Sequence, residues 1–353
     1  MNNSTDIVEN KQKEVKSFNL DSKFFQYLFM ITAAFLIFGL LLLILGKDPI
    51  QSYRDIFSST LGSSYGFSEV LVGMTPVLLT ALAVALPSKL ILINVGAEGQ
   101  LYIGAAFATW GALTFSHLPA WQLIPLMMLL GMAGGALWAF IPAYLKSIGL
   151  VNETITSLVL NSVAPKIIGF LIFGFWHSAM DTNKTARFVD AARLPAFFGT
   201  RVTLGFVFGL VLLLIFWLIM KYSRWGLEIR AIGGNPQASI RNGLPVKKYI
   251  LSVFMLGGAF AGLAGMVQAS GYFGLMLTNF SIGWGFMGFL ISWLVGGDPL
   301  GIILMSFLVS VIFSGGNLLQ ITSGVPYSII NILLALTLFI VLAKPSFSIN
   351  RRK

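Results

Sequence analysis

The sequence contains no cysteine and only two histidines, His117 and His177, among its 353 residues. Without cysteine the chain can form no disulfide and can offer no thiolate to a substrate or a metal. Two histidines leave little material for a histidine-based metal site. Charged residues are also scarce, at 10%, whereas a soluble domain usually carries about a quarter. These absences argue against a soluble protein, a thiol enzyme and a metalloenzyme.

Apolar residues are abundant instead: 56% of the chain is hydrophobic and the mean hydropathy is +0.85. A helix needs about 20 apolar residues to cross a bilayer, so the length allows about ten spans joined by short loops. The 37 glycines favour close packing of such helices. We therefore predict an all-α polytopic membrane protein with approximate spans at 24–46, 69–87, 90–115, 121–145, 150–176, 203–220, 249–271, 282–296, 300–314 and 326–343.

The formal net charge of +10 could indicate nucleic-acid binding, but the cations lie at span ends and in loops. That distribution is typical of positive-inside topology, with contacts to membrane lipid and none to nucleic acid. It predicts that both termini are cytoplasmic, although the outer loop 177–202 carries four cations of its own. The expected organisation is a cytoplasmic tail at 1–23, one membrane domain at 24–343 and a basic cytoplasmic tail at 344–353.

One polar, glycine-broken segment interrupts the apolar sequence. Irregular backbone survives at membrane depth only where it is buried in protein or lines a cavity. A carboxylate at that depth costs roughly 2.5 to 3.5 kcal/mol on insertion scales. We expect this segment to line or support a transport pathway, with its acid accepting hydrogen bonds from nearby amides. One polar residue of the predicted span 150–176 is added to it, and the residues are Asn94, Gly96, Glu98, Gly99, Gln100 and Asn161.

The cytoplasmic loop 221–248 contains the signals of a short capped helix. Asn235 can cap the helix, and Pro236 suits its first position because the missing N–H does no harm there. Gly243 supplies a left-handed stop. Helices of about two turns are marginal alone, so packing against the protein's own spans or against a separate subunit must hold this one. Basic residues alone would favour contact with lipid headgroups, whereas the capped helix favours docking.

Three motifs in family order resemble the permease subunits of bacterial ABC importers of the ribose, simple-sugar and nucleoside group. The first is Asn94 to Gln100, the second is Asn152 to Asn161, and the third starts at Arg230 and continues through Gly243. A glycine-rich stretch, Gly258 to Gly265, extends the third motif into the next span. The resemblance covers nearly all of the chain after about residue 60, and the nucleoside-type permeases are the most similar.

This resemblance implies a fold of the type II importer kind, in which two permease subunits form a pore at their interface. The partners it implies are an ATP-binding subunit, a second permease subunit and an extracytoplasmic substrate-binding protein or lipoprotein. The expected location is the bacterial plasma (inner) membrane. The residues expected to couple to the ATPase are Arg230, Gly233, Gly234, Asn235, Pro236, Arg241 and Gly243.

We expect no ATP-hydrolysing domain on this chain, because the sequence has no Gly-x-x-x-x-Gly-Lys-Ser/Thr motif, the loop that binds the phosphates of ATP. We expect a transport subunit that is no enzyme and needs no cofactor, since ATP is bound by the partner. The transported solute is expected to be a nucleoside, with ribose, other simple sugars or riboflavin as alternatives. A different class, an ion-coupled secondary transporter, would use Glu98 and Lys166 as coupling residues but leaves the capped helix without a role.

Overall fold

The computed structural model describes the chain in two compact units, residues 1–52 with 328–353, and residues 53–327. In the first unit the described residues between 35 and 44 are helical, and α3 (Pro49–Leu61) begins there. The expected tails 1–23 and 344–353, and most of the expected spans 24–46 and 326–343, lie outside the described residues. The residues that the structure describes are 32, 35–40, 42–44, 46–178, 181–197, 199–323, 332, 335 and 336.

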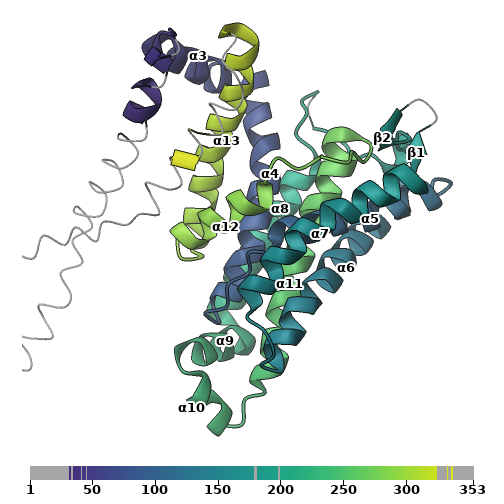
Figure 1. Ribbon diagram of the computed structural model, residues 1–353, viewed down its shortest axis with the longest axis vertical. Helices are drawn as coiled ribbons and strands as arrows, with labels where there is room; N and C mark the ends of the chain where they lie inside the picture. The colour runs from purple at the N-terminus through teal and green to yellow at the C-terminus, as the bar shows by residue number, and fades with distance from the viewer. Residues whose placement is uncertain are drawn as a thin grey trace, which may run out of the picture. The chain divides into compact units, whose positions relative to one another are not determined.

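The second unit is built almost wholly of helices, which confirms the all-α prediction (Figure 1). Among the described residues, six helices are long and apolar enough to cross a membrane, α11 being counted together with the π-helical turn η2 (Gln268–Phe273) that follows it. These six are α4 (Ser64–Ser88), α6 (Ala120–Ser147), α7 (Glu153–Gly174), α8 (Leu204–Tyr222), α11 (Val246–Val267) and α13 (Pro299–Ser323).

The elements that do not fit the predicted spans are α3, α5 and α12. Helix α3 falls in a segment predicted to be a loop. Helix α5 (Ala97–Thr114) begins seven residues later than the predicted span at 90, because residues 90–96, which include Asn94 and Gly96, form turns and irregular backbone. Helix α12 (Trp284–Leu294) has 11 residues, about 16 Å, and so reaches only halfway across a hydrocarbon core of about 30 Å. The predicted span 300–314 was too short, since α13 continues to Ser323.

Small residues bring α5, α6 and α11 together in the core of this unit. A Cβ atom on Gly135 of α6 would lie 2.8 Å from the Cα of Gly262 on α11. A Cβ atom on Gly131, one turn earlier, would lie 3.0 Å from the Cβ of Met266. Backbones this close gain dispersion contacts that larger side chains would prevent. The predicted use of glycine in helix packing is confirmed here.

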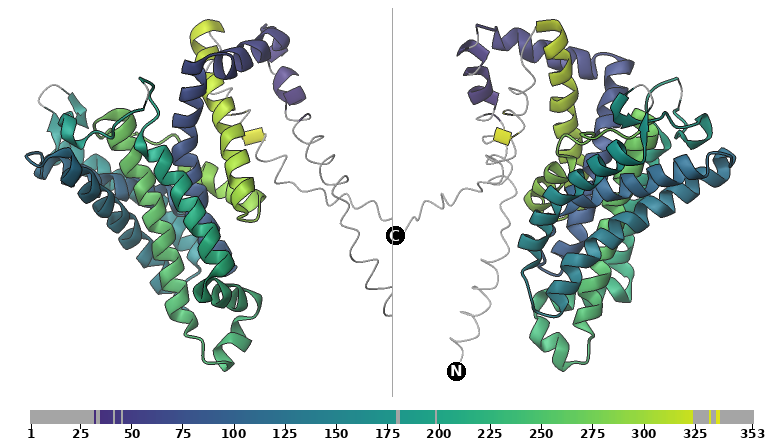
Figure 2. Two further views of the ribbon diagram at one scale, coloured as in Figure 1. Left: turned by 180° about the vertical axis from the view of Figure 1, so that it is seen from behind. Right: turned by 45° about the vertical axis from the view of Figure 1, so that its right-hand side comes forward.

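The two ends of the unit carry different connecting structures (Figures 1 and 2). One end holds two short helices, α9 (Arg224–Gly234) and α10 (Pro236–Arg241). The other end holds a hairpin of β1 (His177–Ser178) and β2 (Asp181–Thr185), followed by the single turn η1 (Asp190–Ala192). The Ser270 hydroxyl joins that connection to η2, since it donates to Ala192 O at 2.6 Å and accepts from Leu194 N at 3.2 Å.

Candidate functional site: a buried polar node, an exposed helix and a cavity

The segment before α5 is held by a closed set of hydrogen bonds between its own side chains. The Asn94 amide donates to Gln100 Oε1 at 3.1 Å, and the Gln100 amide donates back to Asn94 Oδ1 at 3.0 Å. Asn94 Oδ1 also accepts from Gly96 N at 3.1 Å. Both side chains are almost fully buried. Buried amides are stable only when paired, so this pair fixes the irregular turn into α5.

Asn161 fastens the same turn to α7. Its Oδ1 accepts from Gly99 N at 2.8 Å, and its amide donates to Val95 O at 2.8 Å. The side chain is 5% exposed. The oxygen and the nitrogen of the Asn161 side chain are therefore both hydrogen-bonded to the turn, and Asn161 does not line the cavity described below.

The Glu98 carboxylate joins the beginnings of two short helices. It lies in the first turn of α5, and its Oε2 accepts from Gly285 N, in the first turn of α12, at 2.6 Å. The amides it accepts from are therefore not those of its own segment, as the sequence suggested, but those of a helix 187 residues away. Helix N-termini attract negative charge, and Glu98 supplies it at both. We call Asn94, Glu98, Gln100 and Asn161 the buried node.

The second glycine-broken segment with an acid, Gly296 to Gly301, is a different kind of structure. Gly296 and Gly297 have φ values of +63° and +67°, which make a tight left-handed turn after α12. Asp298 is exposed and its Oδ2 accepts from Gly301 N at 2.9 Å, capping α13. The two glycine-broken segments that contain an acid therefore differ: one lies in the core and the other is a surface turn.

Lys89, which follows α4, contacts this surface turn. Its ammonium group donates to Gly296 O at 3.0 Å. Burial lowers the pKa of Lys89, and the nearby Asp298 carboxylate raises it in part. Close in sequence to Lys89, the amide of Ile93 donates to Glu153 Oε1 at 3.4 Å, and Glu153 Oε2 forms a 2.7 Å ion pair with Lys146. Residues 89–93 are thus tied to α6, α7 and the turn after α12.

The capped helix predicted in loop 221–248 is confirmed as α10. Asn235 Oδ1 accepts from Ala238 N at 3.0 Å, Pro236 takes the first position, and Gly243 has a φ of +81°. Helix α9, which the sequence did not predict, precedes it and buries Ile229 and Ile232 against the protein. The protein's own α9 therefore supports α10.

The outward surface of α9 and α10 is basic with two exposed apolar side chains. Leu227 is 61% exposed and Ile240 is 53% exposed. The cations around them that are exposed are Arg224, Arg230, Arg241, Lys247 and Lys248. Leu227 and Ile240 are therefore accessible to a partner protein at this end of the unit.

Gly233 connects α9 to the segment that leads into the buried node. It is buried, and a Cβ atom there would overlap the carbonyl oxygen of Lys89. Gly234 beside it is exposed and has no atom within 4 Å of the position a Cβ would take. Of the two adjacent glycines, only Gly233 is required for a close backbone contact.

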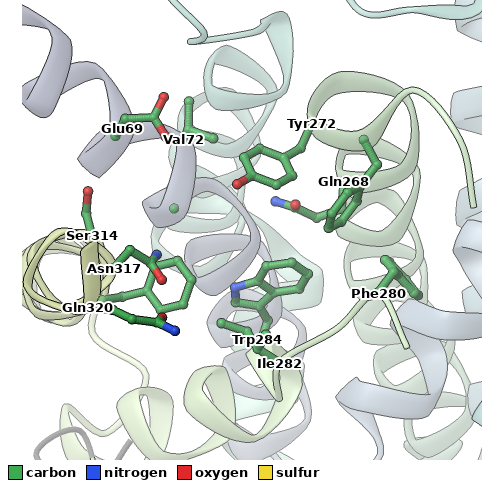
Figure 3. A pocket seen from close by; sticks show the side chains of 13 residues that line it. Glu69, Val72, Gln268, Tyr272, Phe280, Ile282, Trp284, Ser314, Asn317 and Gln320 are labelled. Carbon is green, nitrogen blue, oxygen red and sulfur yellow. The ribbon is translucent and has the colours of Figure 1, made fainter. Parts of the chain in front are cut away.

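A cavity of about 470 Å³ lies beside the first turn of α12, where Trp284 lines it (Figure 3). We call it the α4–α13 cavity, because α4 and α13 provide two of its walls and residues 268–284 provide the third. In Figure 3 the side chains of Gln268, Tyr272 and Trp284 face those of Asn317 and Gln320 across it. Its lining is Glu69, Val72, Gly73, Gln268, Tyr272, Phe273, Phe280, Ile282, Trp284, Phe313, Ser314, Asn317 and Gln320.

Arg201 lies at the rim of the cavity. Its Nη1 contacts the two carboxylate oxygens of Glu69 at 3.2 and 3.3 Å, and its guanidinium carbon lies 4.8 Å from the ring centre of Tyr272. Partial burial lowers the pKa of Arg201, but the attraction of Glu69 and Tyr272 outweighs burial and the pKa is raised. The one carboxylate in the cavity lining is therefore paired.

Sequence reasoning missed the cavity almost completely. Gln268 carried a weak signal, since it is a lone amide within an apolar span. Among the described residues, no group of three His, Cys, Asp or Glu side chains could hold a metal ion.

Comparisons with known proteins assign the family. Residues 66–342 match the model of the branched-chain amino acid transport system / permease component family. A glucose ABC transporter permease protein of Haloferax volcanii is 36% identical, covering 90% of this chain and 86% of the relative. A nucleoside ABC transporter permease protein of Lactococcus lactis is 31% identical (90% of each chain), and a guanosine ABC transporter permease protein of Bacillus subtilis is 32% identical (86% and 88%). The chain therefore belongs to this permease family and is the multi-pass permease component of an ABC transporter.

Proposed function

We propose that this permease component is one of two permease subunits of an ATP-driven importer for neutral nucleosides in a bacterial plasma membrane. Its partners would be an ATP-binding subunit, a second homologous or identical permease and an extracytoplasmic binding protein or lipoprotein, with both termini of this chain cytoplasmic. The relatives from Lactococcus lactis and Bacillus subtilis, named for nucleoside and guanosine transport, support this solute. A simple sugar is the second candidate, because the relative from Haloferax volcanii is named for glucose.

The buried node supports a neutral solute. Half-length helices in transporters often aim their N-termini at an anionic group of the substrate. Here the N-termini of α5 and α12 meet at Glu98, whose carboxylate already accepts from Gly285 N. A second negative charge would be repelled from this position. The place where an anionic solute would bind is filled by the protein's own acid.

Coupling to the ATPase rests on one observation, a continuous set of contacts from α10 to the α4–α13 cavity. Asn235 joins α10 to α9, and Gly233 of α9 packs on the backbone of Lys89. Residues 90–96 continue from Lys89 into the buried node. Glu98 then binds the first turn of α12, where Trp284 lines the cavity.

In the mechanism we infer, closure of the ATP-binding subunits displaces α10, and the contact between Gly233 and Lys89 transmits the displacement. Packed interfaces shift between discrete arrangements, so this movement would alter the wall formed by α12. Lys89 also bonds Gly296 O at the turn after α12, and we expect this bond to break when the cavity opens toward the cytoplasm. The solute would arrive from the binding protein at the opposite end, near Arg201.

The test is to purify the complex and identify by mass spectrometry the ligand carried by its binding protein. We expect a co-purifying ATPase, a bound nucleoside, and nucleoside uptake into proteoliposomes only when ATP is supplied. A tightly held sugar or flavin would contradict the nucleoside assignment. Uptake by the isolated chain under an ion gradient, without ATP, would contradict the ATP-driven mechanism itself.

A further inference from the structure

The side chain of Gln268 carries a buried hydrogen-bond acceptor that no other described residue pairs. Its side chain is 3% exposed, and its Oε1 has no hydrogen-bond partner within the described residues. Buried acceptors are nearly always paired, so an unpaired one that lines a cavity calls for a donor from outside the protein. Gln268 lines the α4–α13 cavity, and Figure 3 shows its amide directed toward the open space.

The backbone around Gln268 is unusual as well. Residues Gln268–Phe273 form a π-helical turn at the end of α11. Such turns are rare, and they occur frequently at functional sites. The turn is fixed from outside through Ser270, whose hydroxyl bonds Ala192 and Leu194. Gln268 and Tyr272, both on this turn, line the cavity together.

The rest of the lining combines flat aromatic surface with uncharged hydrogen-bonding groups. Trp284 is 5% exposed and its ring lies 6.5 Å from that of Phe280, so this wall is packed in place. The amides of Asn317 and Gln320 face it from α13. The charge of Glu69 is paired with Arg201. A volume of about 470 Å³ is within the usual range of small-molecule sites.

We propose that the α4–α13 cavity is a solute-binding subsite for a neutral molecule with a flat ring and N–H or O–H donors, and that Gln268 is its specificity-determining acceptor. The inference rests on the proposed import function and narrows the solute class. A nucleoside satisfies both requirements. A hexose has the donors without the flat ring, and its faces are weaker partners for Trp284 and Tyr272.

The experiment uses the complete transporter in proteoliposomes, with labelled adenosine as the probe and initial uptake measured against concentration. Gln268→Met keeps the shape of the side chain and removes the acceptor. We expect the KM for adenosine to rise about tenfold, the ratio that one ordinary hydrogen bond provides, with ATP hydrolysis retained. The matched control is Thr109→Val, because the Thr109 hydroxyl is also buried and unpaired but lies outside the cavity. Its KM should not change.

Analogues that each lack one donor identify the contact: purine riboside lacks the amino group, and 2′-deoxyadenosine and 5′-deoxyadenosine each lack one hydroxyl. We expect the wild-type transporter to disfavour one of them about tenfold and Gln268→Met to lose that discrimination. The binding protein is the same in both measurements, so its own selectivity cancels. Equal discrimination by wild type and Gln268→Met for all three analogues would overturn the role of Gln268.

Two further results separate this inference from the proposed function. If Gln268→Met fails to assemble, Asn317→Leu on the opposite wall replaces it, and an unchanged KM in that variant overturns the subsite. If the wild-type transporter takes up glucose and no nucleoside, the nucleoside function and the flat-ring solute class both fail. If it takes up adenosine while the KM in Gln268→Met stays at the wild-type value, only the subsite inference fails.

Discussion

The buried node and helix α10 are both short polar features next to glycine, but their side chains have different partners. In the buried node, the amides of Asn94, Gln100 and Asn161 bond one another or nearby backbone. On α10, the exposed Ile240 and Arg241 project outward from the chain. Polar groups satisfied from within stabilise a shape, whereas a short helix with an exposed apolar residue suits a partner. We therefore infer that the first region is structural and the second is an interface.

The largest effect is expected from breaking the buried node at Glu98. Glu98→Leu removes the acceptor of Gly285 N and leaves that amide unpaired in the core. A lost hydrogen bond to a charged group costs about 2 to 3 kcal/mol, so the melting temperature of the purified complex should fall by several degrees. Asp298→Ala is the matched control, since it removes an acid that caps a helix at the surface and should cost about 1 kcal/mol. Equal losses of stability in the two variants would show that Glu98 stabilises the fold no more than a surface helix cap does.

A somewhat smaller loss of stability is expected when Asn161 is replaced. Asn161→Leu keeps the branched shape of the side chain but deletes the bonds to Gly99 N and Val95 O, and we expect a loss of about 2 kcal/mol in thermal unfolding. Ser162→Leu, at the exposed neighbouring position of α7, should change stability by less than about 0.5 kcal/mol. If instead Asn161→Leu melts like the wild type and changes only the KM, Asn161 contacts the solute and our structural assignment is wrong.

The connection between the buried node and α10 can be tested at Gly233 of α9, which contacts Lys89. Gly233→Ala forces a Cβ atom against Lys89 O, which should displace α9 at a cost of about 1 to 2 kcal/mol. We expect ATP hydrolysis by the complex to continue while solute uptake per ATP falls. Gly234→Ala meets no atom within 4 Å and should leave uptake per ATP unchanged. Normal coupling in Gly233→Ala would show that force does not pass through Lys89.

The smallest effect is expected at the exposed surface of α10. Ile240→Ser should weaken binding of the ATP-binding subunit about fivefold, in a titration of the purified subunits, without lowering the melting temperature of the permease. Leu150→Ser, in the connection between α6 and α7, removes another exposed apolar residue and serves as the control. Binding that weakens equally in both variants would argue against α10 as the docking helix.

Local features of the structure followed from the sequence because their causes are local. Asn235, Pro236 and Gly243 specify the beginning and end of α10 within nine residues, and the structure has this helix. Hydropathy located α6, α7 and α8 to within a few residues. Hydropathy failed at α12, because an apolar segment of 15 residues does not show that only 11 of them will be helical.

The membrane class, the family motifs and the costly polar segment at Asn94 to Gln100 can all be recognised from the order of the residues alone. How the polar segment is stabilised depends on the folded structure, since the Glu98 carboxylate bonds Gly285, a residue 187 positions away. The same holds for the α4–α13 cavity, whose walls come from three distant segments. Hydropathy and capping are properties of neighbouring residues, whereas the pairing of a buried polar group depends on which helices the packing of the core brings together.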